Sequence, residues 1–186
     1  PLWSRGLGDV YKRQDMKNKA LIFSKLILFA HTDKKTPTTY CNLQLEDGSE
    51  IKLTGGHVIL VGEHQKAVLA RNVKIGDSLY KRNLGYVKVQ NISQVTEIGF
   101  CCPMTECGNI LVNGILTSCY ANLADITVFG KSLISAQTIG WLAIVPVIVY
   151  RKIMKDKGRK KVTESDSSYH PYIAFLKEAF KPFIAY

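Results

Sequence analysis

Residues 108–121 read GNILVNGILTSCYA, which places two apolar runs on either side of the dipeptide Asn113-Gly114. An Asn-Gly pair between apolar runs is the strongest short-range signal for a β-hairpin, because both central residues of a type I′ turn need positive φ. The stretch therefore predicts a hairpin formed by residues 110–112 and 115–118, followed directly by Cys119 and Tyr120.

Short strand patterns separated by turn signals continue upstream of this hairpin. Residues 40–45 alternate between apolar and polar side chains, Asp47-Gly48 offers a tight turn, and residues 51–54 return. Many short strands at close spacing are typical of an all-β domain and not of an α/β domain. Further short strands are expected at residues 20–30, 58–61, 67–70, 78–80, 84–90 and 92–96.

The composition bounds the size of the domain and the kind of partner. A chain of 186 residues that is 46% hydrophobic is long enough for one packed domain with a tail. The formal net charge is +10, but residues 151–161 alone hold seven basic residues and one acidic residue. Because the positive charge is concentrated in one run, a broad nucleic-acid-binding face is not expected, and no nucleic acid is predicted as a partner.

The apolar tail allows two structures. Residues 132–150 contain no charged residue across nineteen positions, and the basic run follows directly. Such a span is about long enough to cross a bilayer as a helix with its basic flank in the cytosol. Gln137, Thr138 and Pro146 favour the alternative, a helix buried against the β domain. Residues 172–186 have apolar side chains near helical spacing, which predicts a short amphipathic helix on a membrane surface or on the protein.

The first fourteen residues stand apart from the rest of the chain. Residues 4–14 read SRGLGDVYKRQ, which resembles the in-frame translation of a common transposon sequencing adapter. We therefore expect residues 1–14 to be a cloning or assembly scar and not native sequence. The expected organisation is then a partial β domain at 15–123 and a mainly helical, hydrophobic and basic tail at 124–186.

Four ordered blocks carry a resemblance to a known family. They are LTGGHVILV at 53–61, VLARNVKIGDSLY at 68–80, VTEIGFCCPMTECG at 95–108, and the hairpin stretch at 108–121. With these blocks, residues 20–123 resemble the hedgehog-type Hint domain, the C-terminal autoprocessing domain of hedgehog proteins, with its N-terminal part missing. The resemblance implies an all-β Hint (hedgehog/intein) fold.

The resemblance also implies that the full-length protein cleaves itself. In this family a cysteine thiol attacks the carbonyl just before it, the peptide becomes a thioester, and a second nucleophile opens the thioester. The departing amide nitrogen must be protonated, and an imidazole titrates near neutrality. By resemblance His57 would supply that proton and contact the scissile amide, and the Thr54 hydroxyl would hold the same amide.

Two further residues are candidates by their place in the resemblance. His31 stands where hedgehogs have the aspartate that activates a sterol hydroxyl, and an imidazole can also act as a general base. The alternative for His31 is a polar residue at a strand end. Cys119 stands where hedgehogs have a cysteine close to the nucleophile and able to pair with it; the alternative is a buried structural thiol. The upstream segment would be the substrate, and the acceptor would be a sterol hydroxyl, another lipid or water.

The cysteines do not have the spacing of a metal site. The chain has five cysteines and no paired CxxC motif, so neither a metal nor a cofactor is expected. Cys41 is the first cysteine, and it lies inside an expected strand after His31, where the family's nucleophile does not stand. The chain as given is therefore expected not to cleave itself.

Two other functions are alternatives at this point. A non-catalytic, membrane-anchored Hint-like binding module would keep the fold without the chemistry. Intein-type protein splicing needs a terminal His-Asn pair, and no His-Asn pair occurs in the chain. By resemblance, the processing domain would work at a membrane or along the secretory pathway.

Overall fold

A computed structural model describes residues 10–14, 21–123, 126–128, 131–134, 136–153, 167–169 and 171–179. Within these ranges residues 21–123 are built from β-strands, and the α-helices α1 (Ala136–Ile153) and α2 (Pro171–Ala179) belong to the C-terminal part. The expected fold class, an all-β domain followed by a tail that contains helices, is confirmed.

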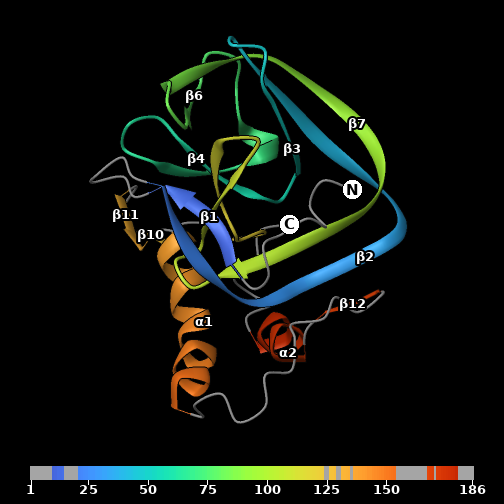
Figure 1. Cartoon of the computed structure of the whole chain (residues 1–186), viewed down its shortest axis with the longest axis vertical. Coiled ribbons are helices and arrows are strands. Elements are labelled where there is room, and N and C mark those ends of the chain that lie inside the picture. The colour runs from blue at the N-terminus through green and yellow to red at the C-terminus, as the bar shows by residue number, and fades with distance from the viewer. Residues whose placement is uncertain are drawn as a thin grey trace.

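Two long antiparallel strands form the backbone of the sheet. β2 (Leu21–Leu45) and β7 (Gly85–Thr105) pair along most of their length, and Figure 1 shows them side by side as two curved ribbons. The sequence predicted each of them as two short strands, 20–30 with 40–45 and 84–90 with 92–96. The prediction was wrong in length because the turn-like residues between the runs are absorbed as register shifts, for example between Asp33 and Pro37.

The remaining strands of this domain are short and antiparallel. In one sheet the strand order is β1-β2-β7-β6-β4-β5, with β3 paired to β2 and β9 paired to both β6 and β8. Asn113 and Gly114 have φ of 52° and 80°, which confirms the predicted type I′ turn between β8 and β9. The bounds are β3 (Glu50–Thr54), β4 (Val58–Val61), β5 (Lys66–Leu69), β6 (Ser78–Lys81), β8 (Asn109–Val112) and β9 (Ile115–Ser118).

The first described strand falls inside residues 1–14. β1 (Val10–Gln14) pairs antiparallel with the start of β2, from Val10 opposite Lys25 to Gln14 opposite Leu21. The assignment of residues 1–14 to an adapter scar is a statement about their origin, which this pairing does not test, and it stays a prediction.

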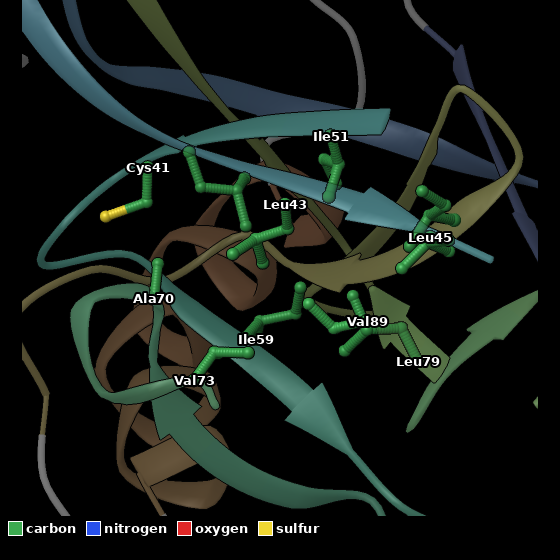
Figure 2. Packing of buried hydrophobic residues seen from close by; sticks show 11 residues of the cluster. Cys41, Leu43, Leu45, Ile51, Ile59, Ala70, Val73, Leu79 and Val89 are labelled. Atoms are coloured by element: carbon green, nitrogen blue, oxygen red, sulfur yellow. The ribbon is translucent and has the colours of Figure 1, made fainter. Parts of the chain in front are cut away.

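The main hydrophobic core lies between the β2–β3 hairpin and the short strands that face it. Alternate residues of β2 and β3 point inward, among them Leu43, Leu45 and Ile51, all fully buried. Ile59 of β4 and Leu79 of β6 meet them from the other side, as Figure 2 shows. This core fixes the ends of β3 and β4, and therefore the turn between them.

Helix α1 packs against the β domain. Ile144 and Ile148 are buried in a cluster with Leu28, Val58 and Tyr120. In the described part of the chain, no helix combines the length and the apolar character that crossing a membrane requires. The sequence left 132–150 between a membrane span and a helix packed on the β domain, and the described helix α1 is packed on that domain. The first residues of 132–150 belong to strand β11 (Lys131–Ile134), which pairs with β10 (Ile126–Val128), and the helix that follows buries one face on the protein.

The second helix lies against the first. The Tyr172 hydroxyl donates a hydrogen bond to the Ala143 carbonyl at 2.8 Å, and Ile173 packs on the cluster that holds α1. Just before α2, β12 (Ser167–Tyr169) pairs with β2. α2 confirms a helix in the first half of the predicted segment 172–186. Residues 180–186, and residues 154–161 of the basic run, lie outside the described residues.

The core makes a direct prediction for stability. Ile59 has 0% of its surface exposed, so Ile59→Ala leaves a cavity and is expected to lower the free energy of unfolding by about 2–5 kcal/mol. Leu84 is 61% exposed, and Leu84→Ala is expected to change the free energy of unfolding by less than about 0.5 kcal/mol. Urea unfolding measures both values. Equal effects of the two variants would contradict the position of this core.

Candidate functional site

The site is built on the tight turn between β3 and β4. β3 ends at Thr54, β4 begins at Val58, and the His57 N–H donates to the Thr54 carbonyl at 2.8 Å. Two residues of the 3-10 turn Ala70–Asn72 hold the outer side: the Arg71 N–H donates to the Gly55 carbonyl at 3.0 Å and the Ala70 N–H to the His57 carbonyl at 2.7 Å. Backbone bonds on both strands therefore fix the direction of the His57 side chain.

The closing segment, residues 118–122, lies along the other side of the turn. The Asn122 N–H donates to the Gly56 carbonyl at 2.7 Å, and the Val58 N–H donates to the Tyr120 carbonyl at 2.9 Å. His57 and Ala121 form an isolated antiparallel bridge between these two bonds. Two motifs far apart in the sequence are thus joined by backbone pairing.

The imidazole of His57 completes the junction. Its Nε2 lies 3.0 Å from the Ser118 carbonyl oxygen. Because a carbonyl only accepts, Nε2 carries the hydrogen, and in the neutral ring Nδ1 holds the lone pair. Burial lowers the pKa of His57 below its ordinary value, and the bond to Ser118 opposes part of that shift. The ring is therefore neutral at pH 7 and presents Nδ1 as a proton acceptor.

Thr54 shares this turn with His57. It is the last residue of β3, opposite Tyr40 of β2, and its carbonyl closes the turn onto His57. The structure thus brings together two of the residues named from the sequence. Ser118 was not named, because it contributes a backbone carbonyl that every residue type possesses.

Cys119 is a buried thiol one residue beyond Ser118. The Thr105 hydroxyl lies 3.4 Å from the Sγ atoms of both Cys119 and Cys107, and it donates to the Asn109 carbonyl at 3.0 Å. Since that hydroxyl has given its hydrogen to Asn109, the Cys119 thiol donates to it. Burial raises the pKa of Cys119 to about 12, so the thiol stays protonated and a poor nucleophile at neutral pH.

His31 belongs to a different strand from Thr54. It sits on β2, opposite Cys102 of β7 and Tyr169 of β12, and its ring meets Phe100 edge-on with the ring centroids 4.5 Å apart. The structure places it on the arm formed by β2 and β7, whereas Thr54 and His57 occupy the β3–β4 turn. Sequence order alone did not separate these two locations.

The cysteines Cys101, Cys102 and Cys107 lie on and just after β7. None of the five cysteines, all within the described residues, forms a disulfide. Within the described ranges, no group of three or more His, Cys, Asp or Glu side chains is arranged to hold a metal ion.

The sequence of this chain is similar to that of known proteins. The chain matches the family model described as Hint module over residues 2–168. Warthog protein 6 of Caenorhabditis elegans is 33% identical over 127 residues, which are 63% of this chain and 21% of that protein. Sonic hedgehog protein of Xenopus laevis is 24% identical over 119 residues, 58% of this chain and 27% of that protein. Protein hedgehog of Drosophila virilis is 23% identical over 181 residues, 90% of this chain and 35% of that protein.

Solved structures of inteins resemble the fold. A DnaB intein from Synechocystis sp. PCC 6803 aligns with a TM-score of 0.48 and 13% identity, covering 60% of this chain and 79% of that chain. The gp41-1 intein aligns with a TM-score of 0.45 and 16% identity, covering 61% of this chain and 99% of that chain. The chain spans only 21% to 35% of the length of the three curated relatives named above.

The partly buried imidazole of His57 predicts a pH dependence of stability. Because the pKa of His57 is lowered on folding, the unfolded chain binds more protons as pH falls below about 6.5. The free energy of unfolding is therefore expected to decrease as pH falls from about 7 toward 5, and His57→Gln should flatten this slope. His64→Gln, at an exposed histidine, is the control and should keep it. Two carboxylates also have lowered pKa values of about 2: Asp33, through a hydrogen bond from the Lys35 backbone, and Asp47, through a hydrogen bond from the Lys81 side chain. They change the free energy of unfolding only below about pH 4, outside the range from about pH 7 to 5. Urea titrations across this range measure the slope, and a slope that survives in His57→Gln would contradict the burial.

Of the two glycines in the turn, only Gly56 stands where a larger side chain would not fit. A Cβ at Gly56 would overlap Asn122 Oδ1 and lie 2.9 Å from Asn122 Cγ, whereas the nearest atom to a Cβ at Gly55 is Arg71 Cβ at 3.5 Å. Gly56→Ala is therefore expected to cost about 1–3 kcal/mol of stability and Gly55→Ala much less. Combining Gly56→Ala with Asn122→Gly should restore stability in thermal unfolding, since it removes the overlapping atoms. A double variant as unstable as Gly56→Ala alone would rule out this contact as the cause.

Proposed function

This chain belongs to the Hint module family, and on that premise we propose that it is part of the self-cleaving domain of a longer protein. In the proposed reaction a cysteine thiol upstream of the described strands attacks the carbonyl before it and forms a thioester, which a second nucleophile opens. The observation that supports this proposal best is the hydrogen bond of His57 Nε2 to the Ser118 carbonyl, at 3.0 Å.

His57 is suited to move the proton that this step requires. As the C–S bond forms and the C–N bond breaks, one proton leaves the thiol and one proton reaches the departing amide nitrogen. A neutral imidazole with a lone pair on Nδ1 accepts the first and then delivers it as the second, so the ring ends unchanged. The Ser118 carbonyl supports the charged intermediate form of the ring because it accepts the Nε2 hydrogen throughout.

Thr54 would act on the same amide. An amide is a poor acyl acceptor, so its carbonyl or nitrogen must be held and polarised. Thr54 stands three residues before His57 in a turn closed by the His57 N–H, which supports the role that the resemblance gives to its hydroxyl. Cys119, held as a neutral thiol, fits the structural alternative better than the pairing role.

The acceptor and the place of reaction follow from the relatives only as proposals. The upstream segment would be transferred to a sterol hydroxyl, another lipid or water, and the reaction would take place along the secretory pathway. His31, on the β2–β7 arm, would be the general base for that acceptor. This assignment requires the acceptor to reach the arm while the thioester lies at the β3–β4 turn.

The proposed function predicts an effect of His57 on cleavage. In a chain extended upstream with its native codons, His57→Ala is expected to slow cleavage by about 10²–10⁴-fold, because it removes the general acid–base. His64→Ala, at an exposed histidine between β4 and β5, is the matched control and should cleave at the normal rate. Gel electrophoresis with time, with and without an added thiol, measures the rate and traps the thioester.

Two outcomes would overturn this proposal. One is normal cleavage by His57→Ala. The other is a native upstream sequence with serine, alanine or no strand where the nucleophilic cysteine is required, since thioester chemistry would then be impossible. The second outcome would favour a non-catalytic Hint-like binding module.

A further inference from the structure

The ring of Tyr120 is enclosed between the closing segment and helix α1. Tyr120 is 3% exposed. A Cβ at Gly140 of α1 would lie 2.6 Å from its Cγ and Cδ1 atoms, and a Cβ at Gly108 would lie 2.9 Å from its Cε2 atom. Such distances are below any normal carbon contact, so the ring occupies a socket that exists only because both positions are glycine.

Further contacts hold α1 to the same part of the domain. Gln137 Nε2 donates to the Gly108 carbonyl at 3.2 Å and to Asn109 Oδ1 at 2.7 Å, at the start of β8. One and two turns beyond Gly140, Ile144 and Ile148 enter the cluster that contains Val58 and Cys119. Figure 1 shows α1 below β1 and the start of β2, with its long axis leading away from the sheet. The first half of the helix is thus anchored on residues next to the site.

Tyr120 is bonded to both sides of the His57 junction. Its carbonyl accepts from the N–H of Val58, the residue after His57, at 2.9 Å. Its own N–H donates to Ser118 Oγ at 2.8 Å, and the carbonyl of Ser118 holds His57 Nε2. A displacement of the Tyr120 ring therefore moves the backbone on which the His57 contact depends.

We infer that α1 positions the His57 imidazole, acting through Gly140 and Tyr120. Gly140 and Tyr120 are positioning residues, since the hydrogen bond to His57 is made by Ser118 and not by either of them. That this position matters for cleavage rests on the proposed function, whereas the effect on the ring itself does not. The site then includes residues outside the four motif blocks, in helix α1, which the sequence allowed to be either a membrane span or a packed helix.

The test uses the 186-residue chain with ¹⁵N-labelled histidine, observed by NMR. Gly140→Val places two methyl groups against the Tyr120 ring, so the closing segment must shift. The partly buried ring of His57 then becomes more exposed to water, and its pKa is expected to rise toward the ordinary value, because burial is the larger cause of the lowering. The Nε2–H, which the Ser118 carbonyl holds in the unchanged chain, is expected to exchange faster with water, so its signal broadens relative to the unchanged chain. In the chain extended upstream, cleavage should fall on the order of a hundredfold.

Two variants separate positioning from general stability. Leu142→Val introduces the same side chain in the same helix at a position 54% exposed, and it should leave the His57 signals unchanged. Tyr120→Phe keeps the ring that fills the socket and should also leave them unchanged. If Gly140→Val stays folded with an unchanged His57 titration and exchange rate, or if Leu142→Val changes them equally, the inference is wrong.

A variant that adds no volume covers the case in which Gly140→Val does not fold. Gln137→Ala removes both hydrogen bonds at the start of α1 and should move the His57 pKa in the same direction by a smaller amount. An unchanged His57 in Gln137→Ala would likewise overturn the inference. The NMR readout does not need cleavage. If the pKa of His57 changes in these variants but the extended chain never cleaves, the positioning role is supported and only the proposed function is rejected.

Discussion

The structure depends on the backbone pairing between the β3–β4 turn and the closing segment. Residues 61 positions apart in the chain meet in one hydrogen bond, from His57 Nε2 to the Ser118 carbonyl. Backbone bonds at Gly56 and Val58 flank it and leave the ring little freedom. A partly buried imidazole without a partner would cost stability, so this carbonyl both stabilises the fold and selects the tautomer whose lone pair is on Nδ1. Fold and candidate chemistry therefore rest on the same contact.

Much of the fold was predictable because local signals were strong. The Asn113-Gly114 hairpin and the alternation in residues 40–45 follow from turn chemistry and side-chain period, which act over a few residues. The length of β2 and β7 was not predictable, because it depends on a partner strand about sixty residues away that tolerates irregular register near Pro37. Local patterns report the face of a strand but not the distance over which another strand accompanies it.

The candidate site shows the same division. His57 and Thr54 could be named from the sequence because the roles proposed for them belong to their side chains, and the block pattern placed them together. Ser118 acts through its carbonyl, and Thr105 through a hydroxyl that takes up the Cys119 thiol, so neither had a signal of its own. The role of α1 was hidden for a different reason. An apolar helix has the same composition whether it faces lipid or protein, and the two are distinguished by tertiary contacts such as the socket at Gly140 and the buried Ile144 and Ile148.

The separation between the β3–β4 turn and the closing segment also sets an order of events during synthesis. A nascent chain that ends before residue 118 contains His57 but no carbonyl to hold its ring, and one that ends before α1 has no side chain or helix face to enclose Tyr120. Contacts of such long range close late, because the loop entropy must be overcome before they form. In a growing polypeptide, His57 therefore gains its hydrogen-bond partner only after the last motif has been synthesised, and Tyr120 is fully enclosed only after the helix beyond it.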